Sequence, residues 1–468
     1  MTVVDSRLHS PSAVQPRSAM VPWSSPAAQQ RLAQLEHELK LDGAAGVAGA
    51  VASAQHGHRS RIDHGVMLYG GTNIMSPEVT ALHDGSLSTR PAQGWPGEKE
   101  QTAVEEIEEL EVLAIDQVAR ALRGKYAEVR YLSATMANLA AYIAFTEPGD
   151  TIAVLSPEAG GHISHQVSGG AAGIRGLTVA HLPYAPYDFD VDAGALERFV
   201  DEVRPRLIVI GGSVTLFPHD IGPVRAAADR VGAVLVYDAS HTAGLIAAGF
   251  YQDPIAEGAD VVTFSTYKTF AGPPGGAAVT NNPEYAERMS LAAYPALLSN
   301  YDPSRLGPLA VAAAEAIEQR PAWAAPTIEC AVEFATQLRA RGLDVVGEDR
   351  GYTRSHQLVI DAGRLGGAWA AIRRLEAAGI FAGHCRLPWQ TAESPSAALR
   401  FGTQEFVRRG GGIAVIPALA DIACRALAEA DADPAQLRAA VAELGEHLGT
   451  DLWGRPASPR ARAAADAQ

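Results

Sequence analysis

The sequence predicts an α/β protein built on a mainly parallel sheet, with a second, smaller domain toward the C-terminus. Along the middle of the chain, short apolar runs alternate with amphipathic segments, which is the pattern of parallel strands joined by crossover helices. The chain has 468 residues, of which 47% are hydrophobic, and this length exceeds one compact core. We therefore expect an N-terminal arm and helix over residues 1–66, a large domain over 67–320 and a small domain over 321–468.

The elements of the first two parts follow from local patterns. Residues 1 to about 28 are rich in Ser, Pro and Ala without periodicity, which is typical of a mobile arm. Apolar residues at helical spacing predict a helix over 31–41 and a longer one near Glu105–Leu122. Strands are predicted by the runs TIAVLS (151–156), RLIVIGG (206–212), AVLVYD (233–238) and DVVTFS (260–265).

The last third of the chain predicts the small domain. An Ala-rich helix around Leu309–Ile317 is followed by RPAWAAP, where two prolines predict a helix break and a hinge. Beyond it, HQLVIDAG predicts a strand and is followed by Ala-rich helices. The tail GRPASPRARAAADAQ is predicted to be frayed.

Charge and cysteine usage exclude several classes of function. The net charge is −15 and Lys and Arg are scattered, so no basic surface for nucleic acid or an anionic membrane is predicted. The cysteines, Cys330, Cys385 and Cys424, lack metal-ligand spacing and do not suggest a disulfide framework. No signal-peptide core and no run of eighteen apolar residues is present. We expect a cytoplasmic protein that acts on a small molecule and holds no metal.

Two strand ends carry the strongest chemical signal. In parallel α/β sheets, ligands bind beyond the carboxyl ends of the strands. AVLVYDASHTAG places Asp238 directly after one strand, and DVVTFSTYKTFAGPPGG places Lys268 just after the next. An amine that forms a Schiff base and an anion that keeps a pyridine nitrogen protonated are what pyridoxal 5′-phosphate (PLP) requires. Either residue alone is more often a turn residue or a solvated cation, but the pair in this context favours a PLP site.

Three further segments offer groups for such a site. SATMAN opens a helix and provides Ser133 and Thr135, which suit a phosphate cup or an ordinary helix N-cap. GGHISH places His162 after two glycines, where its ring can stack on a cofactor or be merely structural. LRFGTQEF contains Arg400, which can clamp a carboxylate or lie on the surface. We expect Arg408 and Arg409 nearby to be surface residues.

Over roughly residues 67–415 the chain resembles serine hydroxymethyltransferase, a fold-type I PLP enzyme of the aspartate aminotransferase superfamily. The resemblance rests on segments in family order: SPEV, GWPG, SATMANLAAY, EPGD, GGHISH, RPRLIVIGG, ADRVGAVLVYDASHTAGLIAAG, ADVVTFSTYKT, AGPPGG, NPEYAERM and RFGTQE. It implies a fold-type I transferase fold, in which a large domain has a mainly parallel, seven-stranded sheet between helices and is joined to a smaller C-terminal α/β domain. It also implies a homodimer with shared active sites, which the sequence alone does not show.

The resemblance assigns roles to individual residues. Lys268 becomes the imine lysine and Asp238 the partner of the pyridinium nitrogen, while His241 lies near the phenolic oxygen of PLP. His162 stacks on the ring and is also a catalytic candidate. Ser133 and Thr135 bind the phosphate, and Arg400 binds the substrate carboxylate.

Several family groups are replaced here. The glutamate in the segment reading GGTNIMSPEV falls on Thr72, and two tyrosines fall on Pro91 and on Glu100 or Gln101. The histidine before the lysine is Tyr267, the arginine after it is Pro274, and the neighbouring subunit's phosphate-binding glycine pair is Ser299-Asn300. We keep Tyr267 as a catalytic candidate, Thr72 as a substrate-binding candidate, and Ser299 and Asn300 as cofactor-binding candidates.

An intact cofactor site beside a rebuilt substrate site argues against ordinary folate-dependent serine–glycine interconversion. The reaction first expected is folate-independent activation of Cα in a β-substituted amino acid of cysteine or serine type. β-Elimination or decarboxylation would follow, in specialised metabolism such as antibiotic biosynthesis. The alternative is aldol or transaldol chemistry on glycine, serine or threonine, as in threonine transaldolases, with His162 or water as base. A PLP-binding regulator without catalysis is a third hypothesis.

Overall fold

The computed structural model describes residues 23–39, 43–389, 398–429, 432–446, 448 and 451–454. Contacts divide the chain into two compact units, residues 1–63 and residues 64–468. The first unit contains α1 (Pro26–Glu38), capped by Ser25, and α2 (Gly43–Asp63). The helix expected over 31–41 is therefore present but begins earlier. The arm expected before it lies mostly outside the described residues, as does nearly all of the tail after residue 454.

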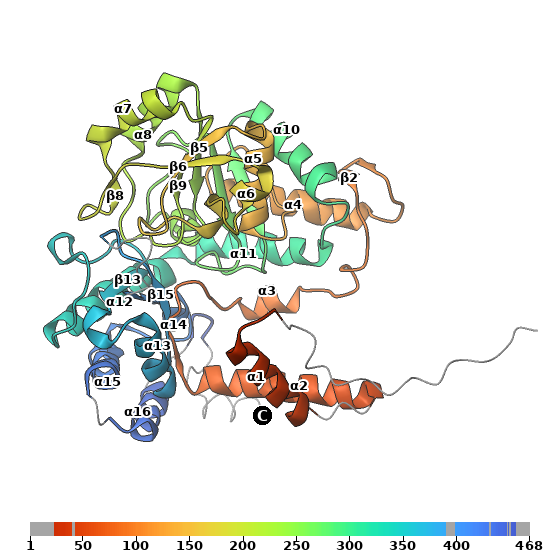
Figure 1. Cartoon of the computed structure of the whole chain (residues 1–468). Coiled ribbons are helices and arrows are strands. Elements are labelled where there is room, and N and C mark those ends of the chain that lie inside the picture. The colour runs from red at the N-terminus through yellow and green to blue at the C-terminus, as the bar shows by residue number, and fades with distance from the viewer. Residues whose placement is uncertain are drawn as a thin grey trace, which may run out of the picture. The chain divides into compact units, whose positions relative to one another are not determined.

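The second unit is built around a seven-stranded sheet of order β4-β12-β11-β10-β9-β5-β6. Strands β11, β10, β9, β5 and β6 pair in parallel, whereas β12 runs antiparallel to both β11 and β4. The predicted α/β, fold-type I architecture is confirmed (Figure 1). The strands are β4 (Tyr126–Glu128), β12 (Gly276–Thr280), β11 (Val261–Ser265), β10 (Val234–Asp238), β9 (Leu207–Gly211), β5 (Thr151–Val154) and β6 (Thr178–His181).

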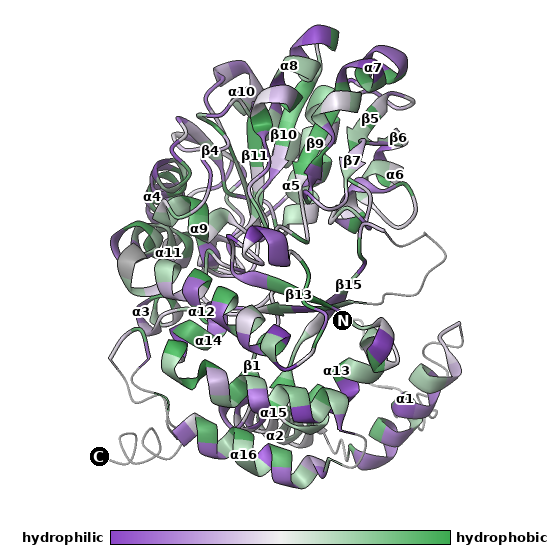
Figure 2. Ribbon diagram, turned by 90° about the vertical axis from the view of Figure 1, so that its left-hand side faces the viewer, coloured by the Kyte–Doolittle hydropathy of each residue, from purple (hydrophilic) through white to green (hydrophobic). Residues whose placement is uncertain are grey.

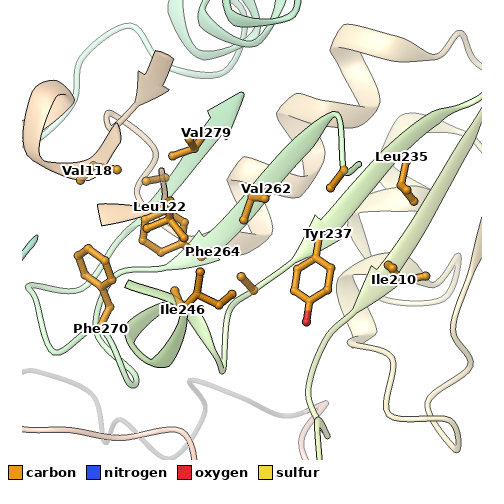
Figure 3. Close-up of a cluster of buried hydrophobic side chains, with 14 of the residues drawn as sticks. Val118, Leu122, Ile210, Leu235, Tyr237, Ile246, Val262, Phe264, Phe270 and Val279 are labelled. Atoms are coloured by element: carbon orange, nitrogen blue, oxygen red, sulfur yellow. The ribbon is translucent and has the colours of Figure 1, made fainter. Parts of the chain in front are cut away.

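Helices cover both faces of this sheet, which explains why its strands are continuous apolar runs rather than alternating ones. Along β9, Leu207 and Val209 pack in one apolar cluster, while Ile208 and Ile210 pack in another on the opposite face. Figure 3 shows part of the second cluster, where side chains of α4 and α9 meet those of the strands. The helices are α4 (Glu105–Ala121), α5 (Ala134–Phe145), α6 (Ala171–Arg175), α7 (Ala193–Val203), α8 (Ile221–Val231), α9 (Ala243–Ala248), α10 (Pro283–Leu291) and α11 (Leu306–Glu318).

A separate apolar cluster forms the C-terminal part of this unit. Its three-stranded antiparallel sheet, β13-β16-β15, carries helices rich in buried Ala and Leu. In Figure 2 the central strands of the large sheet are green, and the helices of both parts expose purple faces. The elements are β13 (Gln357–Asp361), β15 (Gly383–Cys385), β16 (Ala398–Gly402), α12 (Arg320–Ala340), α13 (Ala368–Ala377), α14 (Gln404–Arg408), α15 (Ile416–Ala428) and α16 (Pro434–Glu446).

The remaining elements are short. One of them, near the start of the second unit, pairs with a strand from its C-terminal part. Strand β1 (Val66–Met67) pairs in parallel with β14 (Ile380–Phe381), and Val66 and Leu68 belong to the C-terminal cluster. The segment that opens the expected large domain thus packs with the expected small one, and the division at 320 stays a prediction. The others are α3 (Pro77–Ala81), β2 (Gly94–Trp95), β3 (Glu98–Lys99), β7 (Tyr184–Ala185) and β8 (Asp190–Val191).

The helix break expected at RPAWAAP falls directly before the motif, its second proline breaks no helix, and the hinge stays a prediction. Helix α11 ends at Glu318, and α12 begins at Arg320 and continues through Pro326. The first proline of the motif lies in the opening turn of α12, where a backbone N–H has no helical partner to lose. Two helices therefore follow one another without a loop. Among the described residues, no helix is long and apolar enough to cross a membrane.

Candidate active site

Asp238 closes β10 at the carboxyl edge of the sheet and is 1% exposed. Its Oδ2 accepts hydrogen bonds from Nε2 of His165 at 3.0 Å and Nδ2 of Asn138 at 3.1 Å, and its Oδ1 accepts one from the backbone N–H of Ser240 at 2.9 Å. Burial alone would raise the pKa of this carboxyl, but His165 and the other donors hold it well below its usual range. The carboxylate is therefore fixed in its charged form, as a pyridinium partner must be.

The side chains that donate hydrogen bonds to Asp238 are themselves fixed by further hydrogen bonds. His165 ends the short turn Ile163–His165, and its Nδ1 lies 2.6 Å from the hydroxyl of Tyr142 on α5. Asn138, also on α5, receives a hydrogen bond on Oδ1 from the hydroxyl of Thr263 at 2.6 Å, which turns its NH₂ group toward Asp238. All of these side chains are buried. Sequence reasoning missed His165, Asn138 and Tyr142; the second histidine of GGHISH and the asparagine of SATMAN were the available signals.

Lys268 lies three residues beyond the end of β11 and is 8% exposed. Among the described residues, its Nζ has no hydrogen-bond or ion-pair partner, so a buried amine is left free to react. Burial lowers the pKa of Lys268 to about 8, against the opposing pull of Asp238 and with a smaller contribution from Arg400. The lowered pKa gives Lys268 more neutral amine at physiological pH than an exposed lysine has, and the neutral amine is the form that condenses with an aldehyde. The backbone carbonyl of Lys268 accepts from Nδ2 of Asn73 at 2.9 Å.

His162 caps the turn that carries His165. The backbone N–H of Ser164 donates to its Nδ1 at 3.1 Å, so the neutral ring carries its proton on Nε2. Burial lowers the pKa of His162 to about 4, which keeps the ring neutral. His162 can therefore stack on a cofactor and donate a hydrogen bond from Nε2, but it is poorly suited to take up a proton.

The predicted phosphate cup lies at the start of α5. Ser133 is the N-cap, and its Oγ accepts from the backbone N–H of Met136 at 3.2 Å, while Thr135 is exposed in the first turn. Gly276, the first residue of β12, packs on the cup: an added Cβ would lie 2.3 Å from the carbonyl oxygen of Ser133. The capping role and the free N–H groups of this turn coexist, so the segment suits a phosphate.

His241 lies in a buried group of polar side chains near the C-terminal sheet. Its Nδ1 is 3.0 Å from the carbonyl oxygen of Gly70 and 3.0 Å from Nε2 of Gln357. The ring stacks on that of His356 at 5.9 Å, and Nε2 of His356 also approaches the oxygen of Gly70. Burial lowers the pKa of both imidazoles, that of His356 to about 3. Two neutral rings thus back the turn that follows β1.

Arg400, on β16, is a buried cation that lacks an anion. It is 6% exposed, its Nη1 donates to the carbonyl oxygen of Ser213 at 2.5 Å, and its Nε has no partner. No carboxylate lies within ion-pair distance among the described residues. A guanidinium taken out of water without a counter-charge is costly, and such a group at the site edge suits a substrate carboxylate.

Thr72 and Tyr267 both lie near Tyr69. The hydroxyl of Thr72 donates to the carbonyl oxygen of Tyr69 at 3.3 Å, and as a threonine this position offers no carboxylate. Tyr267 precedes Lys268 and is 36% exposed; burial raises the pKa of its phenol, and the nearby Tyr69 adds to this. The amide of Gln404 donates to the carbonyl oxygens of Tyr69 and Thr72, fixing the turn between them.

Within one chain, the structure does not bring Ser299 and Asn300 to Lys268 and Asp238. Ser299 and Asn300 are exposed, and Ser299 accepts through its carbonyl oxygen and its Oγ from Nε2 of Gln93, whose Oε1 accepts from Nε2 of Gln101. In the described part of the chain, neither residue contacts Lys268 or Asp238. Their expected role concerned a neighbouring subunit, so it stays a prediction.

The expectation that Arg408 lies on the surface is wrong. Its side chain is 1% exposed, and its guanidinium lies 5.1 Å from the ring of Trp323 and 5.8 Å from that of Trp453. Aromatic faces take the place of water around this cation. Arg409 is partly exposed and pairs with Glu405 at 2.8 Å. A five-residue helix, α14, turns the first arginine inward and the second outward.

Comparisons with known proteins agree with this geometry. A family model described as serine hydroxymethyltransferase matches residues 47–422. An α-methylserine aldolase of Variovorax paradoxus is 38% identical over 92% of this chain and 96% of its own length. A serine hydroxymethyltransferase of Korarchaeum cryptofilum is 37% identical over 85% of this chain and 94% of its own. An L-threonine transaldolase structure from Pseudomonas fluorescens, in its internal aldimine state, shares the fold with a TM-score of 0.78 and 23% identity, covering 93% of this chain and 95% of that one.

Proposed function

Because the chain belongs to the serine hydroxymethyltransferase family of PLP-dependent enzymes, we propose that it is a folate-independent aldolase that cleaves an α-substituted β-hydroxy amino acid of the α-methylserine type. The enzyme acts on amino acids by aldol or transaldol chemistry. Of the reactions expected from the sequence, the comparisons support this alternative, and none of them supports β-elimination or decarboxylation. The observation that carries the finer proposal is the near full-length similarity to α-methylserine aldolases.

The site residues fit the cofactor. Lys268 offers a buried amine that has no partner among the described residues, Asp238 a fixed carboxylate, and the first turn of α5 a phosphate cup. When bound, PLP draws electrons from the bonds at Cα of an attached amino acid. Arg400 then binds the substrate carboxylate and sets which Cα bond is placed for cleavage.

A quaternary Cα narrows the chemistry. Such a carbon carries no hydrogen, so elimination that begins with loss of the Cα proton is not available. In retro-aldol cleavage the Cα–Cβ bond breaks, the β-hydroxyl loses its proton, Cβ leaves as an aldehyde, and Cα takes up a proton. α-Methylserine gives formaldehyde and alanine, which balances all atoms.

Lys268 is the proposed proton carrier. Its Nζ has a pKa of about 8, so it can accept the hydroxyl proton and return one to Cα near neutral pH. His162 is the weaker candidate, because Nδ1 is occupied and Nε2 carries the ring's proton. With Thr72 in place of the family glutamate, this position contributes no second base.

The experiment supplies the holoenzyme with both enantiomers of α-methylserine, without tetrahydrofolate, and measures formaldehyde and alanine. We expect equal amounts of the two products, and no formation by the Lys268→Ala variant. Serine with and without tetrahydrofolate, and S-methylcysteine assayed for pyruvate, serve as comparisons. Cleavage that requires folate, or pyruvate release as the faster reaction, would overturn the proposal.

A homodimer with shared sites is part of the same proposal. Ser299 and Asn300 are exposed and lie beside Gln93, away from the Lys268 group of their own chain. Mixing inactive Lys268→Ala protomers with protomers made inactive at Ser299 and Asn300 should restore part of the activity if these residues complete a partner's site. Absence of any restored activity in a mixed dimer, or a monomer by light scattering, would contradict this arrangement.

A further inference from the structure

Tyr69 lies near Arg400, Thr72 and Tyr267, and no role has yet been assigned to its ring. It follows Leu68, which is fully buried in the C-terminal cluster, and its ring is 39% exposed. Its carbonyl oxygen accepts from the amide of Gln404 at 2.9 Å and from the backbone N–H of Thr72 at 3.3 Å. The backbone is thus fixed on one side while part of the ring faces open space.

Gly71 and Gly383 leave the space that the Tyr69 ring occupies, and we call this pair of glycines the seat of the ring. A Cβ built on Gly71 would lie 2.9 Å from Cε1 of Tyr69, and one built on Gly383 would lie 2.7 Å from Cε2. The two glycines therefore abut opposite edges of the same ring. Neither has a positive φ, so backbone conformation does not explain them. The glycines are explained by the ring of Tyr69, because a Cβ at either position would collide with it.

The seat places the ring against Arg400. The guanidinium carbon of Arg400 lies 5.8 Å from the centre of the Tyr69 ring. Gly383 is the residue opposite Arg400 in the β15–β16 pairing, so one strand pair carries both the seat and the cation. At one end of the guanidinium, Nη1 donates a hydrogen bond to the carbonyl oxygen of Ser213. The ring limits rotation about that contact, because displacement would lose the cation–π attraction.

We propose that Tyr69, clamped between Gly71 and Gly383, is a positioning residue that holds the guanidinium of Arg400 in the orientation that receives the substrate carboxylate. The aromatic ring, and not the hydroxyl, performs this role. The proposal rests on the proposed function only in taking Arg400 as the carboxylate site. It assigns Tyr69 to substrate binding, with no part in holding the cofactor.

The test measures binding rather than turnover. Glycine and methylamine, which differ by the carboxylate, are titrated into the holoenzyme and followed by the absorbance of the bound cofactor. In the Tyr69→Leu variant the dissociation constant for glycine should rise about tenfold, while that for methylamine stays within about twofold. Tyr69→Phe should behave like the unmodified enzyme toward both ligands.

A double-mutant cycle tests the seat. Gly383→Ala should displace the ring and weaken glycine binding about as much as Tyr69→Leu, and the two changes together should cost no more than one. Additive losses, an equal loss of methylamine binding, or a Tyr69→Phe variant as weak as Tyr69→Leu would each overturn the proposal. Cofactor absorbance reports correct folding of every variant. A holoenzyme that binds in this pattern but does not cleave α-methylserine would refute only the proposed reaction.

Discussion

The cofactor side and the substrate side of the site are built on opposite principles. Around Asp238, carboxylate, imidazole, amide and hydroxyl groups pair with one another in a buried network. Around Arg400, a buried cation keeps an unpaired Nε, and the phenols of Tyr69 and Tyr267 are partly exposed. A satisfied network rigidifies what it holds, whereas open polar groups are costly until a ligand completes them. In the proposed function, the cofactor stays bound at the rigid side and the substrate exchanges at the open side.

The largest effect is expected at Lys268, where the two sides meet. Lys268→Ala removes both the anchor and the proposed proton carrier, and turnover should fall by about 10⁴-fold or more. The exposed Lys125 provides the matched control, and Lys125→Ala should retain activity. If Lys268→Ala kept the cofactor absorbance of the unmodified enzyme, another lysine would be the anchor.

The next largest loss of turnover is expected in the Asp238 network, where it should be larger for Asp238 itself than for His165. Asp238→Asn removes the charge that holds the pyridine nitrogen protonated and should lower turnover by about 100-fold or more. His165→Asn leaves the carboxylate but removes one donor, and a loss of about tenfold is expected. Turnover and the dissociation constant of PLP are measured for both. Equal losses of turnover in the two variants would show that His165 does more than hold Asp238.

A substitution at Arg400 should weaken binding of the amino acid without weakening binding of PLP. Arg400→Lys keeps the charge but loses the planar, two-pronged donor, so KM for the amino acid should rise about 10- to 100-fold. The dissociation constant of PLP should stay unchanged, because in the described part of the chain Arg400 makes no hydrogen bond or ion pair with the Asp238 network. Weakened cofactor binding in this variant would mean that the two sides are one structural unit.

The smallest effect concerns pH and the rate at which the apoenzyme captures PLP. The pKa of Lys268 is lowered to about 8 by burial, so the reactive neutral amine is scarce below that pH and predominates above it. The capture rate should therefore rise about tenfold between pH 7 and pH 9 and then level off. Stopped-flow absorbance at constant ionic strength measures it. A rate that is flat across this range would place the pKa outside it.

Local patterns were enough to predict the residues at strand and helix ends. Asp238, Lys268 and Ser133 stand where a buried run gives way to a turn or a capped helix, and such junctions can be seen in one stretch of sequence. Arg400 lies in a strand of the other sheet; the chemistry of its guanidinium suggested a carboxylate clamp or a surface residue, and resemblance to a family favoured the clamp, which stays a prediction. His165 and Asn138 could not be ranked in the same way, because their importance depends on meeting Asp238 across the fold. Arg408 was misread because nothing local reveals Trp323 and Trp453 beside it.

The sequence by itself determined the α/β architecture and the cofactor, and it predicted Lys268 as the anchor, because hydrophobic periodicity and strand-end chemistry are properties of adjacent residues. Only the tertiary structure decided which side chains hold Asp238 in its charged form, that α12 runs through RPAWAAP, and that Tyr69 lies between two glycines under Arg400. These features join segments far apart in the chain. Their energies come from packing, burial and hydrogen-bond geometry that exist only once the segments are brought together.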